Sequence, residues 1–163
     1  MQLERSTRSR LLAGLVVLIL PLAAGAAPLV PGASFPSLSL EDQHGKTVST
    51  RADTRIVLFA ADKAANDLIN GVLAAQPAGV LGTLNAVYFA DISAMPALVT
   101  RMFALPALRE MPFAVGLGRD ATQLADLPRQ KGAATILRVD DGKVIAIEYA
   151  HDTGQLKQAI GLK

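Results

Sequence analysis

The sequence contains no cysteine among its 163 residues, and this absence excludes several kinds of chemistry. A chain without thiols cannot exchange disulfides, reduce peroxide through cysteine or bind a metal through thiolates. It also cannot form a disulfide bond, so the folded domain must be stabilised by burial of its core alone.

Tryptophan is absent as well, and histidine occurs only twice, as His44 and His151. A zinc site needs three or four protein ligands. Pairing either histidine with Asp141 or Asp152 would require a closeness that the sequence does not show. We therefore expect no metal and no cofactor.

Nucleotide-binding and hydrolase motifs are also lacking. The sequence has no G-x-S-x-G, the motif of many serine hydrolases. Gly116-Leu-Gly118 lacks the third glycine of a dinucleotide-binding loop, and Gly79–Gly82 lacks the lysine of a phosphate-binding loop. We expect both glycine pairs to lie in loops.

The net charge of the chain gives no indication that it binds nucleic acid. The formal net charge is +2, and Arg5, Arg8 and Arg10 outnumber Glu4 by two within the first 26 residues. The rest of the chain is therefore neutral overall, which removes the electrostatic argument for nucleic acid or anionic lipid as a partner.

The first 26 residues have the composition of a secretory signal peptide. A cationic start is followed by an apolar run at Leu11–Leu22 and by small residues at Ala24–Ala26. We predict cleavage between Ala26 and Ala27 and a periplasmic destination. The alternative is an uncleaved membrane anchor over Leu11–Val30, although its prolines and glycines make a poor helix.

The remaining sequence predicts an alternation of strands and helices. Continuous apolar runs at Arg55–Ala60 and Asn85–Ala90 are typical of buried strands. The other expected elements are a hairpin around residues 41–46, helices over 62–75, 93–108 and 153–162, a strand at Pro112–Leu117, a helical turn or two at Ala121–Leu127, and a hairpin turning at Asp140–Lys143. This order predicts a mixed sheet with helices on both faces, a three-layer α/β/α sandwich.

Three segments make the chain resemble the thioredoxin fold, in its redoxin-type secreted branch. They are Phe35–Lys46, similar to the first hairpin of that branch, Val57–Ala60 leading into a helix, and Ala133–Lys143 before a final strand and helix. Pro28, Pro31, Gly32 and Pro36 predict an extended segment at residues 27–34. The resemblance implies a thioredoxin-like domain over residues 35–163.

The same resemblance shows what this chain lacks. Redox-active members carry Cys-x-x-Cys where the strand enters the first long helix, and those sulfur positions fall here on Ala64 and Asp67. Members of the family also place a cis-proline before the penultimate strand, at a position that corresponds here to Ala133 or Ala134. Both active-site elements are missing, so the resemblance implies a fold kept without its chemistry.

Two groups of residues are candidates for binding. Asp62, Lys63, Ala64, Asn66 and Asp67 form a polar corner at the former Cys-x-x-Cys position, which suits a polar ligand or acid–base work by Asp67. Helix capping by Asp62 and a favourable helix-dipole position for Asp67 explain the same acidic residues without a ligand.

The second group is a docking patch at Met95, Met111 and Phe113, whose residue types also suit an ordinary core. From these residues we expect a protein-binding or assembly module with an unidentified periplasmic protein partner and without a catalytic residue. The alternative is an enzyme that binds a small molecule or cofactor at the polar corner.

Overall fold

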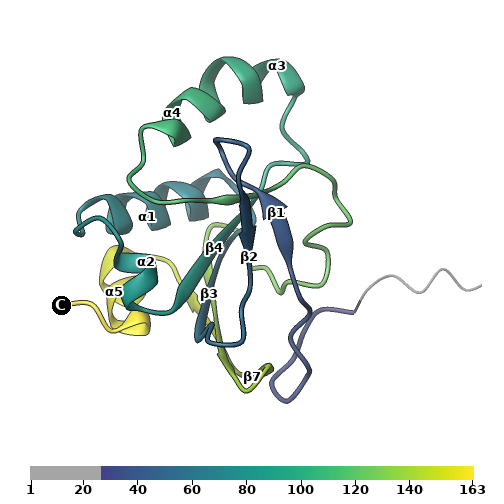
Figure 1. The fold of residues 1–163 in the computed structure, drawn as a ribbon, viewed down its shortest axis with the longest axis vertical. Helices are drawn as coiled ribbons and strands as arrows, with labels where there is room; N and C mark the ends of the chain where they lie inside the picture. Colours follow the sequence, from purple (N-terminus) through teal and green to yellow (C-terminus); the bar gives the residue numbers. More distant parts are fainter. Residues whose placement is uncertain (1–26) are drawn as a thin grey trace, which may run out of the picture.

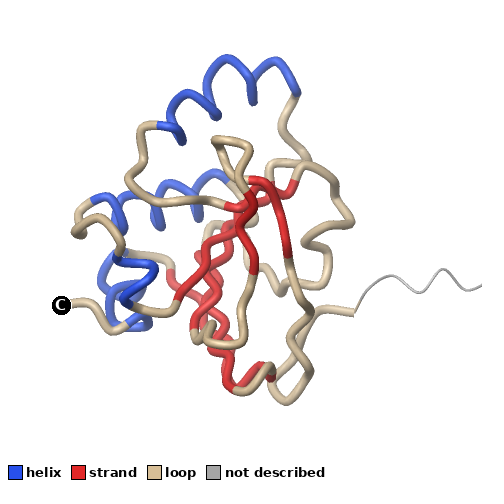
Figure 2. The backbone as a smooth tube through the Cα atoms, viewed as in Figure 1, coloured by secondary structure: helices blue, strands red, loops and turns tan. Residues whose placement is uncertain are grey.

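The computed structural model describes residues 27–163, and the predicted signal peptide lies outside this part of the chain. Its centre is a sheet whose strands are drawn in red in Figure 2 together with the first hairpin. This sheet has five strands in the order β5-β4-β3-β6-β7. The strands are β3 (Ile56–Ala60), β4 (Ala86–Asp91), β5 (Gly116–Gly118), β6 (Ala134–Asp140) and β7 (Lys143–Ala150). The first three are parallel and the last two antiparallel, which confirms the predicted mixed sheet.

Both predicted hairpins are present. Strands β1 (Ser39–Glu41) and β2 (Thr47–Ser49) pair with each other and lie in front of β3 and β4 in Figure 1. The second hairpin turns at Asp141 and Gly142, which both have positive φ angles. Asp-Gly adopts this backbone more readily than other pairs, so local sequence decides the turn.

One face of the sheet is covered by helices. These are α1 (Lys63–Ala74), the short α2 (Val80–Thr83) and α5 (Thr153–Ile160). They lie to the left of the sheet in Figure 1, and their apolar side chains form one buried cluster with Leu58 and Tyr88. Helix α2 corrects our expectation of a loop at Gly79–Gly82, because burial of Val80 against this cluster stabilises a single helical turn. The loop expected at Gly116–Gly118 is also wrong, because these residues pair with β4 as strand β5.

The opposite face is covered by the first hairpin and a turn-rich segment. Leu124 and Leu127 pack there with Phe59 and Phe89 in a second buried cluster. Three layers are therefore present, but residues 121–126 form turns where we expected helix. The Asp120 carboxylate accepts hydrogen bonds from the Thr122 backbone and hydroxyl, an alternative that competes with helix formation.

A segmented helix follows β4. It consists of α3 (Ala97–Val99), the π-helix η1 (Thr100–Ala104) and α4 (Leu105–Arg109). The predicted start at Ser93 is wrong, because the Asp91 carboxylate accepts hydrogen bonds from both the backbone and hydroxyl of Ser93. The wider π turn immediately precedes Pro106, whose ring and missing N–H disfavour a regular α-helix there.

The extended segment at residues 27–34 follows the surface of this domain. The backbone N–H of Leu29 donates to Asp126 and that of Gly32 to Val144, and Ser34 forms a bridge to Lys143. The end of this segment is therefore attached to the first residues of the edge strand β7, and Leu29 to the turn-rich segment.

Candidate functional site

The carboxylate of Asp62 joins two elements at the N-terminus of α1. One oxygen accepts a hydrogen bond from the Ala65 backbone N–H at 2.9 Å, and the other accepts one from the Gly132 N–H at 2.7 Å. The Ala65 N–H, followed by that of Gly132, holds the pKa of Asp62 below its ordinary value. Asp62 therefore caps the helix, as its sequence position predicts, and also binds the segment that leads into β6.

The other residues of the polar corner lie on α1. Lys63 and Asp67 are exposed and form an ion pair one helical turn apart, while Ala64 is exposed beside them. The Asn66 side-chain oxygen accepts a hydrogen bond from the buried Tyr88 hydroxyl at 2.7 Å. Burial raises the pKa of Tyr88, so this hydroxyl stays protonated and keeps Asn66 in place.

The two positions predicted to replace the cis-proline are buried. Ala133 precedes β6 and Ala134 is its first residue. No cis peptide bond occurs within residues 27–163. The segment before β6 contacts the polar corner through Gly132, whose backbone N–H donates a hydrogen bond to Asp62.

The polar corner and part of the predicted docking patch line one cleft. The cleft has a volume of about 480 Å³ and lies between α1 and the segmented helix. Its lining includes most of the polar corner together with Met95 and Met111. Phe113 is the exception, because it is buried against Tyr88 with ring centroids 6.3 Å apart and cannot contribute to a surface patch.

The outer side of the segmented helix is apolar. Helical spacing puts Leu98, Met102 and Leu105 on one apolar face, and Leu105 is partly buried against the core. Leu98 and Met102 are instead 68% and 58% exposed. Together with Val99 and Phe103, which are 41% and 65% exposed, they form what we call the apolar ridge.

A buried glutamine in the first hairpin holds the end of the segmented helix. The Gln43 side-chain nitrogen donates to the carbonyl oxygens of Leu108 and Phe113, at 3.2 and 2.7 Å. Its side-chain oxygen accepts from the Val115 N–H at 3.0 Å. The side chain thus replaces strand pairing at residues 113–115, which is why β5 begins later than the predicted strand at Pro112. The sequence offers no sign of this contact, since the partners lie 65 to 72 residues away.

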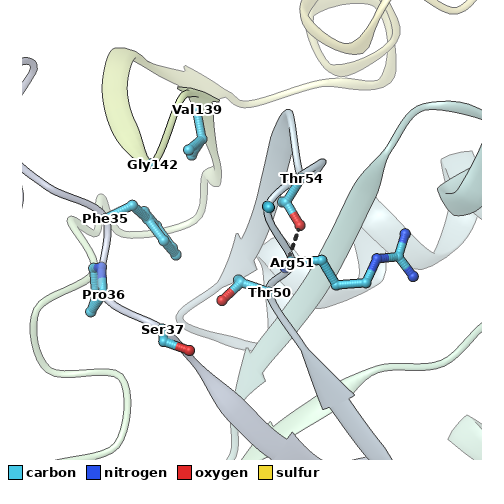
Figure 3. A pocket seen from close by; sticks show the side chains of 9 residues that line it. Phe35, Pro36, Ser37, Thr50, Arg51, Thr54, Val139 and Gly142 are labelled. Atoms are coloured by element: carbon cyan, nitrogen blue, oxygen red, sulfur yellow. Dashed lines mark hydrogen bonds between the residues drawn. The ribbon is translucent and has the colours of Figure 1, made fainter.

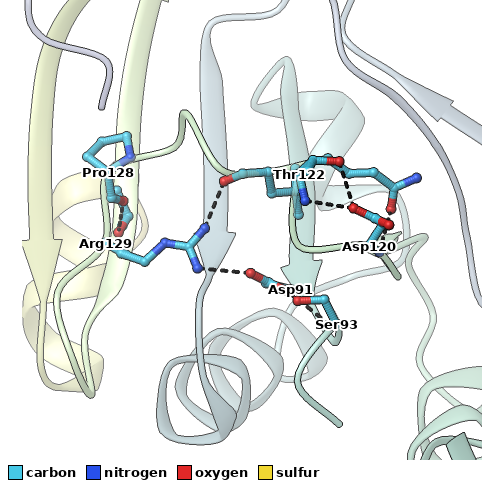
Figure 4. Close-up of polar contacts among 9 residues, drawn as sticks. Asp91, Ser93, Asp120, Thr122, Pro128 and Arg129 are labelled. Atoms are coloured by element: carbon cyan, nitrogen blue, oxygen red, sulfur yellow. Dashed lines mark hydrogen bonds and ion pairs between the residues drawn. The ribbon is translucent and has the colours of Figure 1, made fainter. Parts of the chain in front are cut away.

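An ion pair joins Asp91, which lines the cleft, to the exposed Arg129. Arg129 donates to the Asp91 carboxylate at 2.9 Å and to the Leu124 carbonyl at 2.8 Å (Figure 4). Its guanidinium group also lies over the Phe59 ring, 5.2 Å from the centroid. The Asp91 side chain is only 8% exposed, so its charge is already balanced before any ligand binds.

A smaller hollow of about 220 Å³ lies elsewhere, between the extended segment and the two hairpins (Figure 3). Phe35 points into it, but the Arg51 side chain points away and pairs with Asp53. No carboxylate lines this hollow, so it offers fewer recognition groups than the cleft.

Within residues 27–163, no three histidine, aspartate or glutamate side chains are grouped so that they could hold a metal ion. The same residues contain no helix that is long and apolar enough to cross a membrane.

Comparison with known proteins gives a likeness of fold. No family model matches the sequence, and no curated protein matches it. A candidate protein disulfide isomerase from Bacteroides thetaiotaomicron aligns with a TM-score of 0.55 at 11% identity, over 82% of this chain and 87% of that protein. A peroxiredoxin-like protein from Aquifex aeolicus gives 0.52 at 9% identity, over 84% and 87%. The thioredoxin domain of a thiol-disulfide oxidoreductase from Bacteroides vulgatus gives 0.50 at 13% identity, over 81% and 99%.

The chain has the thioredoxin-like fold. This confirms the resemblance inferred from Phe35–Lys46, Val57–Ala60 and Ala133–Lys143. Since the whole sequence lacks cysteine, this thioredoxin-like chain has none of the thiol chemistry for which the comparison proteins are named.

Replacing Asp62 with alanine removes both hydrogen bonds that its carboxylate accepts. We expect the free energy of unfolding at pH 7 to fall by about 1–2 kcal/mol, as for other N-cap replacements. The Asp62→Asn variant keeps a cap acceptor and should lose less. Urea unfolding measures both, and equal losses in the two variants would contradict the capping role.

The same carboxylate should contribute to acid sensitivity. Its folded pKa is lowered, so its stabilising effect is complete above the unfolded pKa, near 4, and is lost as the pH falls through the folded pKa. Asp62→Asn has no such group to protonate. Its stability should therefore fall less than that of the unmodified chain between pH 6 and pH 2, measured by urea unfolding.

Replacing Gln43 with leucine leaves the buried Phe113 carbonyl and Val115 N–H without their partner, whereas the Leu108 carbonyl still accepts from the Met111 N–H. We expect the free energy of unfolding to fall by about 2–3 kcal/mol, with faster proteolytic cleavage within residues 97–112. Gln158→Leu, an exposed change on α5, should alter stability by less than about 0.5 kcal/mol. Unchanged proteolysis in Gln43→Leu would show that this amide does not hold the segmented helix.

Proposed function

We propose that this chain is a secreted, non-catalytic thioredoxin-like domain that binds a protein partner through the apolar ridge. The observation that carries the proposal is the exposure of Leu98, Met102 and Phe103 together on one short helical segment. Contiguous apolar side chains of this size are costly to leave in water and are typical of interaction surfaces.

The position of the ridge supports this assignment. The segmented helix is fixed at its C-terminal end by Gln43, whose backbone carbonyl also accepts a hydrogen bond from Arg109. A preorganised surface loses less conformational entropy on binding than a loose one. The ridge is thus presented on a supported segment.

Secretion rests on residues 1–26, whose composition suits a cleaved signal peptide that directs the domain to the periplasm. Retention of that segment as an N-terminal anchor is the alternative. In either case, a cysteine-free fold suits an oxidising compartment because it cannot form unwanted disulfides.

An enzyme that uses the polar corner has weaker support. A general acid or base works best with a pKa near the working pH. The pKa of Asp62 is lowered instead, and Asp67 is exposed and paired with Lys63. Both carboxylates thus have the environment of structural or binding groups.

In-cell crosslinking followed by affinity capture of the tagged full chain tests this proposal. We expect one protein to be enriched reproducibly and to be lost in Leu98→Asp and Met102→Asp, because a buried interface does not accept an unpaired carboxylate. Both side chains are exposed, so the variants should keep their unfolding midpoints.

Ile145→Asp is the matched control, because Ile145 is 58% exposed on β7 and lies outside the ridge. It should keep the partner. Equal capture by Leu98→Asp and Ile145→Asp, or no enrichment by the unmodified chain, would contradict the proposal.

A further inference from the structure

The cleft behind the apolar ridge is open because small residues line it. Ala60 and Ala90 lie where β3 and β4 end, and Ala104 and Ala107 lie on the segmented helix. Larger apolar side chains complete that side, namely Ile92, Met95, Leu108 and Met111. A cleft of about 480 Å³ falls within the range of small-molecule sites, roughly 300–1,000 Å³.

The α1 side of the cleft is polar and contains an unpaired acceptor. Asn70 lines the cleft, and its side-chain oxygen is buried without a hydrogen-bond partner among the described residues. A buried oxygen in this position is stabilised by a donor, so it favours a ligand that carries N–H or O–H groups.

The carboxylates of the cleft favour a positive charge elsewhere on the ligand, at the N-terminal end of α1. Asp67 pairs with Lys63, and Asp91 pairs with Arg129. Asp62 accepts hydrogen bonds only from backbone N–H groups, and within residues 27–163 no cationic side chain forms an ion pair with it. Lys131 acts on it only at longer range. Asp62 is thus the carboxylate at the cleft that a ligand cation can still pair with.

We propose that the cleft binds a small amphipathic amine, with its apolar body against the segmented helix and its ammonium group at Asp62. A second N–H or O–H group of the ligand would donate to Asn70, about two helical turns further along α1. This site adjoins the apolar ridge that we assign to a protein partner: Val99 and Phe103 line both, whereas Leu98 and Met102 belong to the ridge alone. It also differs from the enzymatic alternative, since no bond is made or broken.

The proposal is tested with the purified full chain and the fluorescent apolar probe N-phenyl-1-naphthylamine. Dodecylamine, dodecanol and laurate share an apolar tail and differ in head-group charge, and each is added below its micellar concentration. We expect dodecylamine to displace the probe at a concentration at least about tenfold lower than laurate, with dodecanol between them. No probe binding, or displacement by laurate as effective as by dodecylamine, would overturn the proposal.

Two kinds of variant test whether Asp62 binds the ammonium head group and whether the probe occupies the cleft. Asp62→Asn should weaken displacement by dodecylamine by about tenfold and leave dodecanol unchanged. Asp152→Asn is the matched control, because Asp152 caps α5 in the same way and does not line the cleft. Equal effects of the two variants on dodecylamine would contradict the role of Asp62.

Ala104→Trp should fill the cleft and abolish probe binding while leaving Leu98 and Met102 exposed. If that variant folds and binds the probe normally, the probe occupies the ridge and the cleft proposal fails. If Ala104→Trp does not fold, Ala107→Leu is used in its place. Ala107 is an exposed residue of the cleft lining, and we again expect probe binding to be lost. The capture experiment with Leu98→Asp is independent of these results, so failure of one proposal does not decide the other.

Discussion

The side chain of Gln43 makes the contacts on which the binding surfaces depend. Its buried amide satisfies Leu108, Phe113 and Val115, and so attaches the segmented helix to the first hairpin. The helix itself buries few large side chains, because Leu98 and Met102 face solvent. Polar contacts at its end therefore supply the support that core packing supplies elsewhere, and they leave the cleft beside α1 open.

Asp62 performs the corresponding role on the other side of the cleft. In the redox-active branch that this sequence resembles, the N-terminus of the first long helix stabilises a thiolate. Here the same kind of helix end stabilises a carboxylate, with the Ala65 N–H as donor and Gly132 as a second donor. A negative charge is thus retained at the helix end in a group that cannot exchange disulfides, which separates the electrostatics of the fold from its chemistry.

Local sequence patterns predicted most of the fold and part of the candidate site. The apolar runs that became β3 and β4, the Asp-Gly turn at Asp141 and the cap at Asp62 each depend on neighbouring residues. The segmented helix could not be predicted in the same way. Its apolar periodicity shows that an apolar face exists but not whether the chain itself covers it, and Ser93 bonds to Asp91 instead of capping the helix.

Long-range contacts explain the other failures. Gln43 lies in a hairpin turn, and its partners are on a distant segment, so no local pattern marks it as buried. Phe113 has the residue type of a surface anchor but packs against Tyr88. The cleft likewise depends on alanines from four separate elements, and each alone is an ordinary residue of a strand or helix.

We propose that a protein partner binds the segmented helix and not the opposite edge of the sheet. Site-specific photo-crosslinking in cells tests this directly, with a photoreactive phenylalanine derivative placed singly at Leu98, Met102, Ile145 and Gln155, of which the last two lie on β7 and α5. We expect an adduct of the same mass from Leu98 and Met102 and none from Ile145 or Gln155. Adducts from Ile145 or Gln155 alone, or from no position, would contradict it.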